Sequence, residues 1–149
     1  MSKSNAFENS LLLLIFNNTN IALIGDATGL RGSTVAGSLF LSLHTADPGE
    51  AGTCTTSETA YTGYARQAVA RSGAGWTVSG TAPTQVSPAA NVTFPECTAS
   101  PGAAITHWGV CAELSGASVL LYKGTVTPNI AVAVGVSPLL KSTSTVTED

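Results

Sequence analysis

The chain of 149 residues is long enough for one ordinary domain, in which folding buries about two thirds of the surface that the open chain exposes. Lys and Arg number 6 and Asp and Glu number 9, so charged residues make up 10% of the chain, against roughly 25% in an average soluble domain. A surface so poor in charge is suited to burial against other proteins. The net charge of −3 leaves no basic patch for a phosphate backbone, so we expect no direct binding to nucleic acid.

The apolar run from Leu11 to Phe16 is far shorter than the ~20 residues that span a bilayer. It is also a poor signal peptide, because Glu8 precedes it and the polar segment 17–20 follows it. We therefore expect the start of the chain to be retained and no membrane to be a partner.

Residues 5–17 predict a helix, with Asn5 as its N-cap and Glu8, three residues later, as the capping-box partner. Its apolar cluster consists of Leu11, Leu12, Ile15 and Phe16. Glycines then mark an irregular connection that ends near Val35.

From Ser38 the apolar period changes from 3.6 to 2, which indicates strands. Asp47-Pro48-Gly49-Glu50 predicts a turn after the first of them. The expected strands are eight in number: 38–44, 63–70, 75–79, 91–94, 104–112, 118–126, 129–136 and 142–147. Short strands without helices between them favour an all-β fold, an antiparallel two-sheet sandwich of jelly-roll type.

The segments 82–90 and 98–103, which contain prolines, are expected to be long loops. We see no internal repeat and no linker between domains. The expected organisation is a helical and irregular arm over residues 1–35, followed by a β-sandwich domain over residues 36–149.

The three cysteines, Cys54, Cys97 and Cys111, are odd in number and lack CxxC spacing, so neither a disulfide framework nor a zinc site is indicated. Reduced thiols are the expectation. A single disulfide between Cys97 and Cys111 is the alternative, if these residues lie on neighbouring strands.

Candidates for catalysis are few. His44, Asp47 and Glu50 are close in sequence, but the turn already explains Asp47. His107, beside Trp108, is better explained as an orienting or interface histidine. No serine lies in a GxSxG elbow. We therefore expect a protein that is not an enzyme, with no catalytic residue, cofactor or metal.

The apolar helix has two interpretations. It covers one end of its own sandwich, or it docks on a neighbouring subunit, where each Leu, Ile or Phe side chain contributes ~1.5–3 kcal/mol before ordering costs. Tyr61, Tyr64, Arg66 and Arg71 supply the aromatic and Arg content that interface hot spots favour. The candidate interaction residues are Leu11, Leu12, Ile15, Phe16, Tyr64 and Arg66.

Several segments together resemble a family of small tailed-phage virion proteins, often labelled tail-fibre proteins and similar in size and layout to jelly-roll capsid cement proteins. The pair LHTADPGE and GYARQAV is its most specific part. The segments are 41–50, 63–69, 92–95, 105–109 and 120–122. The resemblance covers nearly the whole chain and implies no catalytic residues.

The expected function is that of a capsid cement or decoration protein, which bridges major capsid subunits in the virion and assembles in the host cytoplasm. Its expected partners are the major capsid protein and further copies of itself, as a dimer or trimer. Deletion of residues 1–20 is expected to abolish capsid binding and leave the sandwich folded. The alternatives are a tail or tail-fibre component and a carbohydrate-binding module that uses Trp76 or Trp108.

Overall fold

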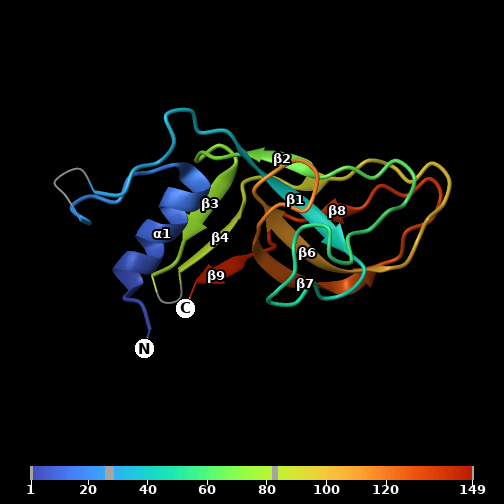
Figure 1. Cartoon of the computed structure of the whole chain (residues 1–149). Coiled ribbons are helices and arrows are strands. Elements are labelled where there is room, and N and C mark those ends of the chain that lie inside the picture. Colours follow the sequence, from blue (N-terminus) through green and yellow to red (C-terminus); the bar gives the residue numbers. More distant parts are fainter. Residues whose placement is uncertain (1, 26–28, 82–83, 149) are drawn as a thin grey trace. The chain divides into compact units, whose positions relative to one another are not determined.

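The computed structural model describes residues 2–25, 29–81 and 84–148. This part of the chain contains one helix and nine strands, and the strands form antiparallel sheets (Figure 1). The all-β class is confirmed, and the arrangement is consistent with a sandwich. Two compact units share the chain. Unit 1 contains residues 1–38, 69–90 and 141–149, and unit 2 contains residues 39–68 and 91–140.

Unit 1 places a helix on a three-stranded sheet. Helix α1 (Asn5–Asn17) packs against β3 (Trp76–Ser79), β4 (Thr84–Pro88) and β9 (Val146–Glu148), which form a sheet in the order β3-β4-β9. Phe16 meets Trp76 edge to face, with 4.7 Å between ring centroids. Leu12 is also fully buried. The first interpretation of the helix is thus the one that these contacts support, since its most buried face lies on its own sheet.

The start of α1 differs by one residue from the prediction. Ser4 is the N-cap, and its hydroxyl accepts a hydrogen bond from the Phe7 N–H at 3.4 Å. Asn5 is therefore the first helical residue, and the expected capping box between Asn5 and Glu8 is wrong. The helix ends at Asn17, and its C-cap Asn18 adopts the left-handed conformation that closes many helices.

Arg71 ties the helix end to the connection that follows it. Its guanidinium donates to the carbonyls of Leu14 and Ile15 at 2.8 and 2.7 Å, and also to the carbonyl of Ala36 at 3.3 Å. The last carbonyls of a helix lack intrahelical partners, so a cation there is well placed. Arg71 thus serves unit 1 internally and is not a free hot-spot residue.

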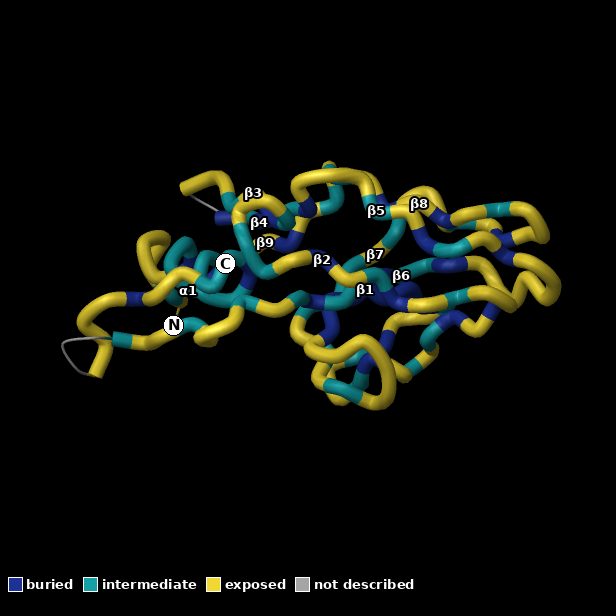
Figure 2. Tube along the Cα trace, turned by 90° about the horizontal axis from the view of Figure 1, so that it is seen from above, coloured by how far each residue is buried: buried dark blue, intermediate teal, exposed yellow. Residues whose placement is uncertain are grey.

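Unit 2 is built on a four-stranded sheet in the order β2-β1-β6-β7 and a two-stranded sheet of β5 (Val92–Thr93) and β8 (Leu139–Leu140). The four strands are β1 (Ser38–His44), β2 (Gln67–Ala70), β6 (Ile105–Cys111) and β7 (Leu120–Ile130). Most buried positions of this sheet lie on β1 and β6 (Figure 2). The central strands therefore hold the core, and β7 forms one edge.

The observed strands correct the sequence prediction in several places, and only the ends of the expected strands 63–70 and 142–147 are found as strands, β2 and β9. The segment 82–90 was expected to be a loop, but it contains β4, the middle strand of its sheet. Strand β7 runs through to Ile130, and the expected strand 129–136 is instead an irregular segment with a turn at residues 134–135. Strand β8 has two residues and had not been expected.

The predicted boundary at residue 35 between an N-terminal arm and a β-sandwich domain stays a prediction. The two compact units are each made of two or three separate segments of the chain. Within the described residues, no helix combines the length and apolar character that a membrane span needs.

Candidate functional site

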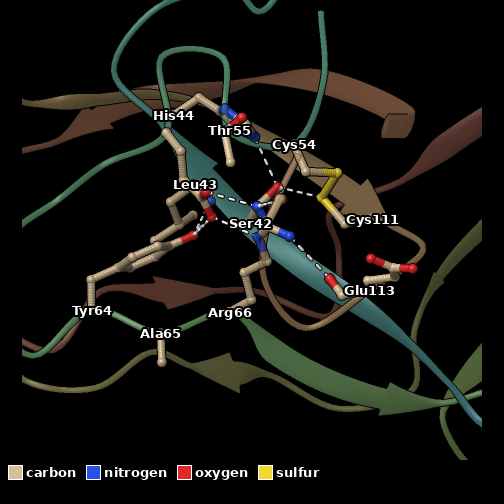
Figure 3. A network of polar contacts seen from close by, with 12 residues as sticks. Ser42, Leu43, His44, Cys54, Thr55, Tyr64, Ala65, Arg66, Cys111 and Glu113 are labelled. Atoms are coloured by element: carbon tan, nitrogen blue, oxygen red, sulfur yellow. Dashed lines mark hydrogen bonds and ion pairs between the residues drawn. A yellow bond between two sulfur atoms is a disulfide. The ribbon is translucent and has the colours of Figure 1, made fainter. Parts of the chain in front are cut away.

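The two motifs on which the family resemblance depends meet in unit 2. His44 lies at the end of β1, and Tyr64 and Arg66 lie in the segment before β2. Figure 3 shows the side chains of Tyr64 and Arg66 directed toward β1. Glu58, from the intervening loop, binds both of them. We call Glu58, Tyr64 and Arg66 the Arg66 cluster.

Arg66 is a buried charge with its partners in place. Its side chain is 2% exposed, and it donates to the two carboxylate oxygens of Glu58 at 2.7 and 2.8 Å. It also donates to the carbonyls of Glu113 and Gly116 at 3.0 and 2.9 Å. The hydrogen bond to Glu58 raises the pKa of the Arg66 guanidinium above its usual, already high value. A bidentate pair of this kind fixes orientation, so Arg66 holds the 113–116 turn against Glu58.

Tyr64 completes the cluster. Its hydroxyl donates to Glu58 at 2.8 Å and accepts from the Leu43 N–H at 3.1 Å. Burial raises the pKa of the Tyr64 hydroxyl well above its usual range. Its ring stacks on Phe94, with 6.2 Å between centroids. Tyr64 therefore connects β1 to the cluster through polar contacts and to the core through its ring.

A second polar group lies on β1. The Thr56 carbonyl can only accept, so His44 Nδ1 donates to it at 2.9 Å, and His44 Nε2 accepts from the Ser42 hydroxyl at 2.8 Å. Gly109 pairs with Ser42 across the sheet, and a Cβ at that position would lie 2.8 Å from the Ser42 hydroxyl. The absence of a side chain at Gly109 leaves room for this hydrogen bond.

The Ser42–His44 distance is that of a nucleophile and its base, but both side chains are 0% exposed. Burial lowers the pKa of His44, which favours its neutral form. The pair can hold a proton in place but offers no surface to a substrate. Its evident role is to anchor the loop that carries Thr56 onto β1.

A disulfide anchors the same loop. Cys54 and Cys111 are joined, with 6.0 Å between their Cα atoms, and both are fully buried (Figure 3). The expectation of reduced thiols is therefore wrong for these two residues, and so is the alternative pairing of Cys97 with Cys111. Cys97 is the free thiol and is buried. Cys54 lies in the loop after β1 and Cys111 at the end of β6, a pairing that sequence spacing does not reveal.

The grouping of His44, Asp47 and Glu50, which the sequence analysis set aside in favour of a turn, does not form. His44 is turned into the sheet, whereas Lys123 binds Asp47 at 3.0 Å and Glu50 at 3.3 Å. The Asp47 carboxylate accepts from the Gly49 N–H at 2.8 Å, and Gly49 has the positive φ, +74°, that the predicted Pro-Gly turn requires. This hydrogen bond and then Lys123 lower the pKa of Asp47. Among the described residues, no group of three or more potential metal ligands comes together.

Two shallow depressions lie beside these groups. One of about 350 Å³ lies between the Arg66 cluster and the 114–116 turn, next to Leu114, which is 56% exposed. The other, of about 230 Å³, lies between the turn residues 49–52 and the first residues of β7. Because the donors of Arg66 are directed at Glu58 and at carbonyls, the first depression offers apolar contact more than anion binding.

The predicted interaction residues fall into two groups. Leu12 and Phe16 are fully buried in unit 1, and Leu11 and Ile15 are half-buried. Tyr64 and Arg66 are brought together in unit 2, where Arg66 is buried and Tyr64 is partly exposed. The sequence did not single out Glu58 or Lys123. Their partners are distant in the chain or lie in loops without periodicity, so no local signal marks them.

The tryptophans do not form a carbohydrate platform. Trp76 is 1% exposed and Trp108 is 4% exposed. A sugar ring would need an open aromatic face, and these two rings are covered by their own units. The carbohydrate-binding alternative thus lacks the residues on which it depended.

Comparison with known protein families identifies one that matches the chain. The family model described as "Podophage GP4 fiber I protein gp80" matches residues 2–138, which include both motifs and the Arg66 cluster. The chain belongs to this family. It is thus a structural protein of a phage virion. A search of curated proteins found no match. The description of the family names a fibre protein.

Proposed function

We propose that the chain is a structural subunit of a tail-fibre assembly, held to neighbouring proteins by apolar surface and backbone pairing. The observation that carries the proposal is a set of strongly exposed apolar side chains on a chain with only 10% charged residues. The most exposed of these are Leu23, Val35, Leu114, Val119 and Val134, with 56–80% of each residue accessible. Such side chains are costly in free solution when they form patches, and they are covered in an assembly.

The fibre position is favoured by the description of the family, which names a fibre protein. The chemistry required is modest. Fibre subunits need repeated contacts, and several weak contacts in one assembly give strong attachment. The proposed role needs no cofactor and no catalytic group.

Capsid cement, bridging major capsid subunits, is the second candidate. The ion-poor surface and the small all-β fold would suit a junction between shell subunits equally well. The two candidates differ in the neighbour that covers the exposed apolar residues and in the number of copies that the particle holds.

Copy number separates the candidates. Quantitative mass spectrometry of purified virions, with isotope-labelled peptides of this chain and of the major capsid protein, gives the ratio of the two. A fibre subunit is expected at a small fraction of the capsid copy number, and antibody labelling in electron micrographs should lie at the tail. A copy number close to that of the major capsid protein, with antibody label over the head, would support the cement role instead.

A further inference from the structure

The segment between α1 and β1 makes a loop in unit 1 whose two limbs are fixed to one another (Figure 1). Ile21 and Leu30 exchange two backbone hydrogen bonds, each 2.8 Å long. Closer to the helix, the Asn18 side chain donates to the Ser33 carbonyl at 2.8 Å and accepts from the Ser33 N–H at 2.7 Å. Because these contacts are internal, the described residues of the loop are ordered before any partner binds. We call residues 21–25, 29 and 30 the apolar loop.

The apolar loop presents uncharged side chains to solvent. Leu23 is 78% exposed, Ile24 is 38% exposed and Leu30 is 43% exposed, and none of the residues of the apolar loop is charged. Leu23 also has a φ of +64°, a conformation that bulky residues seldom adopt. A strained residue that exposes a large apolar side chain is typical of a contact with another protein.

Unit 2 contains a concave surface of matching character. The depression of about 350 Å³ between the Arg66 cluster and the 114–116 turn has a mainly apolar lining, and Leu114 beside it is 56% exposed. Its volume is at the lower end of the roughly 300–1,000 Å³ of ligand sites, which leaves room for branched side chains. The donors of Arg66 are bound to Glu58 and to carbonyls, so the depression does not require a charged partner.

The distribution of charge favours a partner that resembles unit 1. Unit 2 contains two Lys or Arg residues and five Asp or Glu residues, a net charge of −3, whereas unit 1 contains four of each kind and is neutral. Two copies that met through their depressions would bring together two units of like charge, with the exposed Glu113 next to Leu114 on both sides. The uncharged apolar loop of another copy avoids this repulsion.

We propose that the apolar loop of one copy inserts Leu23 and Ile24 into the depression beside Leu114 of a second copy. The two surfaces differ, so the contact is heterologous, and every copy added leaves one loop and one depression open at the ends of a head-to-tail row. The inference deepens the proposed function, on which it rests, because it names a second copy of this chain as the partner. A row of copies is an arrangement from which a fibre can be built.

The first test measures the mass of the purified full-length chain by sedimentation velocity over a range of concentrations. The unmodified chain is expected to grow beyond the dimer as the concentration rises. Leu23→Asp places a charge in the contact and suits the left-handed conformation of this position, and Leu114→Asp places a charge at the depression. Each variant alone should associate at least about tenfold more weakly. The matched control Val134→Asp changes a residue of unit 2 that is 62% exposed and does not line the depression, and it should associate like the unmodified chain.

The second test mixes the two variants and shows whether the two surfaces meet each other. L23D retains its depression and L114D retains its apolar loop, so an equal mixture has one productive contact per pair and should form dimers and nothing larger. Circular dichroism of each variant should match that of the unmodified chain. The proposal is overturned by an unmodified chain that stays monomeric or stops at the dimer, by a mixture that stays monomeric, or by a V134D variant that loses association as L114D does. None of these results bears on the position of the protein in the virion, which copy number decides separately.

Discussion

Arg66 is the residue around which unit 2 organises its loops. It is buried with a carboxylate and two carbonyls as partners, and these partners come from segments up to 50 residues away in the chain. A buried ion pair contributes little net stability over apolar residues of similar volume, but losing one member leaves an uncompensated buried charge. The ion pair therefore has its largest effect on stability when only one of its two residues, Arg66 or Glu58, is replaced.

The first prediction follows from this asymmetry. Arg66→Leu should lower the free energy of unfolding by about 3–5 kcal/mol, because Glu58 and two carbonyls lose their partner. The double variant R66L/E58L should recover part of the loss. Urea unfolding at neutral pH measures both. Arg31→Leu, at an exposed position, is the control and should change stability by less than about 0.5 kcal/mol. A loss for R66L no larger than that of R31L would contradict the organising role.

At the scale of elements, the loop 45–58 is fixed to the sheet at several points. The His44–Thr56 hydrogen bond, the backbone bond from the Thr45 N–H to the Ser57 carbonyl and the Cys54–Cys111 disulfide all contribute. Each sulfur also lies beside an oxygen, at 3.3 Å from the Val119 carbonyl and 3.2 Å from the Ser42 hydroxyl. A disulfide has no hydrogen to donate, so these are contacts in the oxidised chain and available acceptors for the reduced thiols.

The second prediction concerns this disulfide. Its two cysteines are 57 residues apart, and the chain-entropy relation for a loop of that length gives a stabilisation of about 4 kcal/mol. The variant C54S/C111S should lose stability by up to that amount in urea unfolding, and a reductant should produce the same loss in the unmodified chain. Cys97→Ser is the control: this variant keeps the disulfide, so a reductant should lower its free energy of unfolding as much as it does in the unmodified chain. An unmodified chain that does not respond to reductant would contradict the contribution.

The sequence predicted a strand correctly where apolar residues alternate and turn residues mark both ends of the alternating segment. Strand β1 matches its expected range because alternating Leu residues are bounded by glycine and a Pro-Gly turn. Strand β4 was not predicted because Pro88 within it and Pro83 before it are typical of loops, although Thr84, Val86 and Pro88 alternate as buried positions. The pattern of branched residues in 129–136 was read as a strand, yet Gly135 has a φ of +85° in the turn that interrupts it. Periodicity reports which side chains could be buried, but pairing partners decide which segments become strands.

For the site, the sequence indicated Tyr64 and Arg66 but not what they bind. The ion pair between Arg66 and Glu58 joins two irregular segments. The disulfide joins Cys54, in the loop after β1, to Cys111, the last residue of β6. Long-range contacts of this kind follow from the topology of the sheet and from no local spacing. The family resemblance, in contrast, came from two motifs that the structure joins through the hydrogen bond between the Leu43 N–H and the Tyr64 hydroxyl.

At the scale of the whole molecule, each compact unit contains one tryptophan. Trp76 lies against Phe16 of helix α1 in unit 1, and Trp108 is a core residue of β6 in unit 2. The expectation that residues 1–20 could be removed without loss of the folded sandwich needs revision, because α1 supplies Leu12 and Phe16 to the core of unit 1. The two tryptophans make it possible to follow the units separately.

The last prediction uses these reporters. Deletion of residues 2–20 should uncover Trp76, so in a W108F background the truncated chain should show red-shifted emission relative to full-length W108F. In a W76F background the emission of Trp108 should change little, because its pairing partners across the sheet, Leu43 and Gly124, belong to unit 2. Emission of Trp76 that stays blue after the deletion would mean that the sheet of unit 1 does not depend on α1. The helix would then be available to a neighbouring subunit, with Phe16 and Leu12 as its anchors.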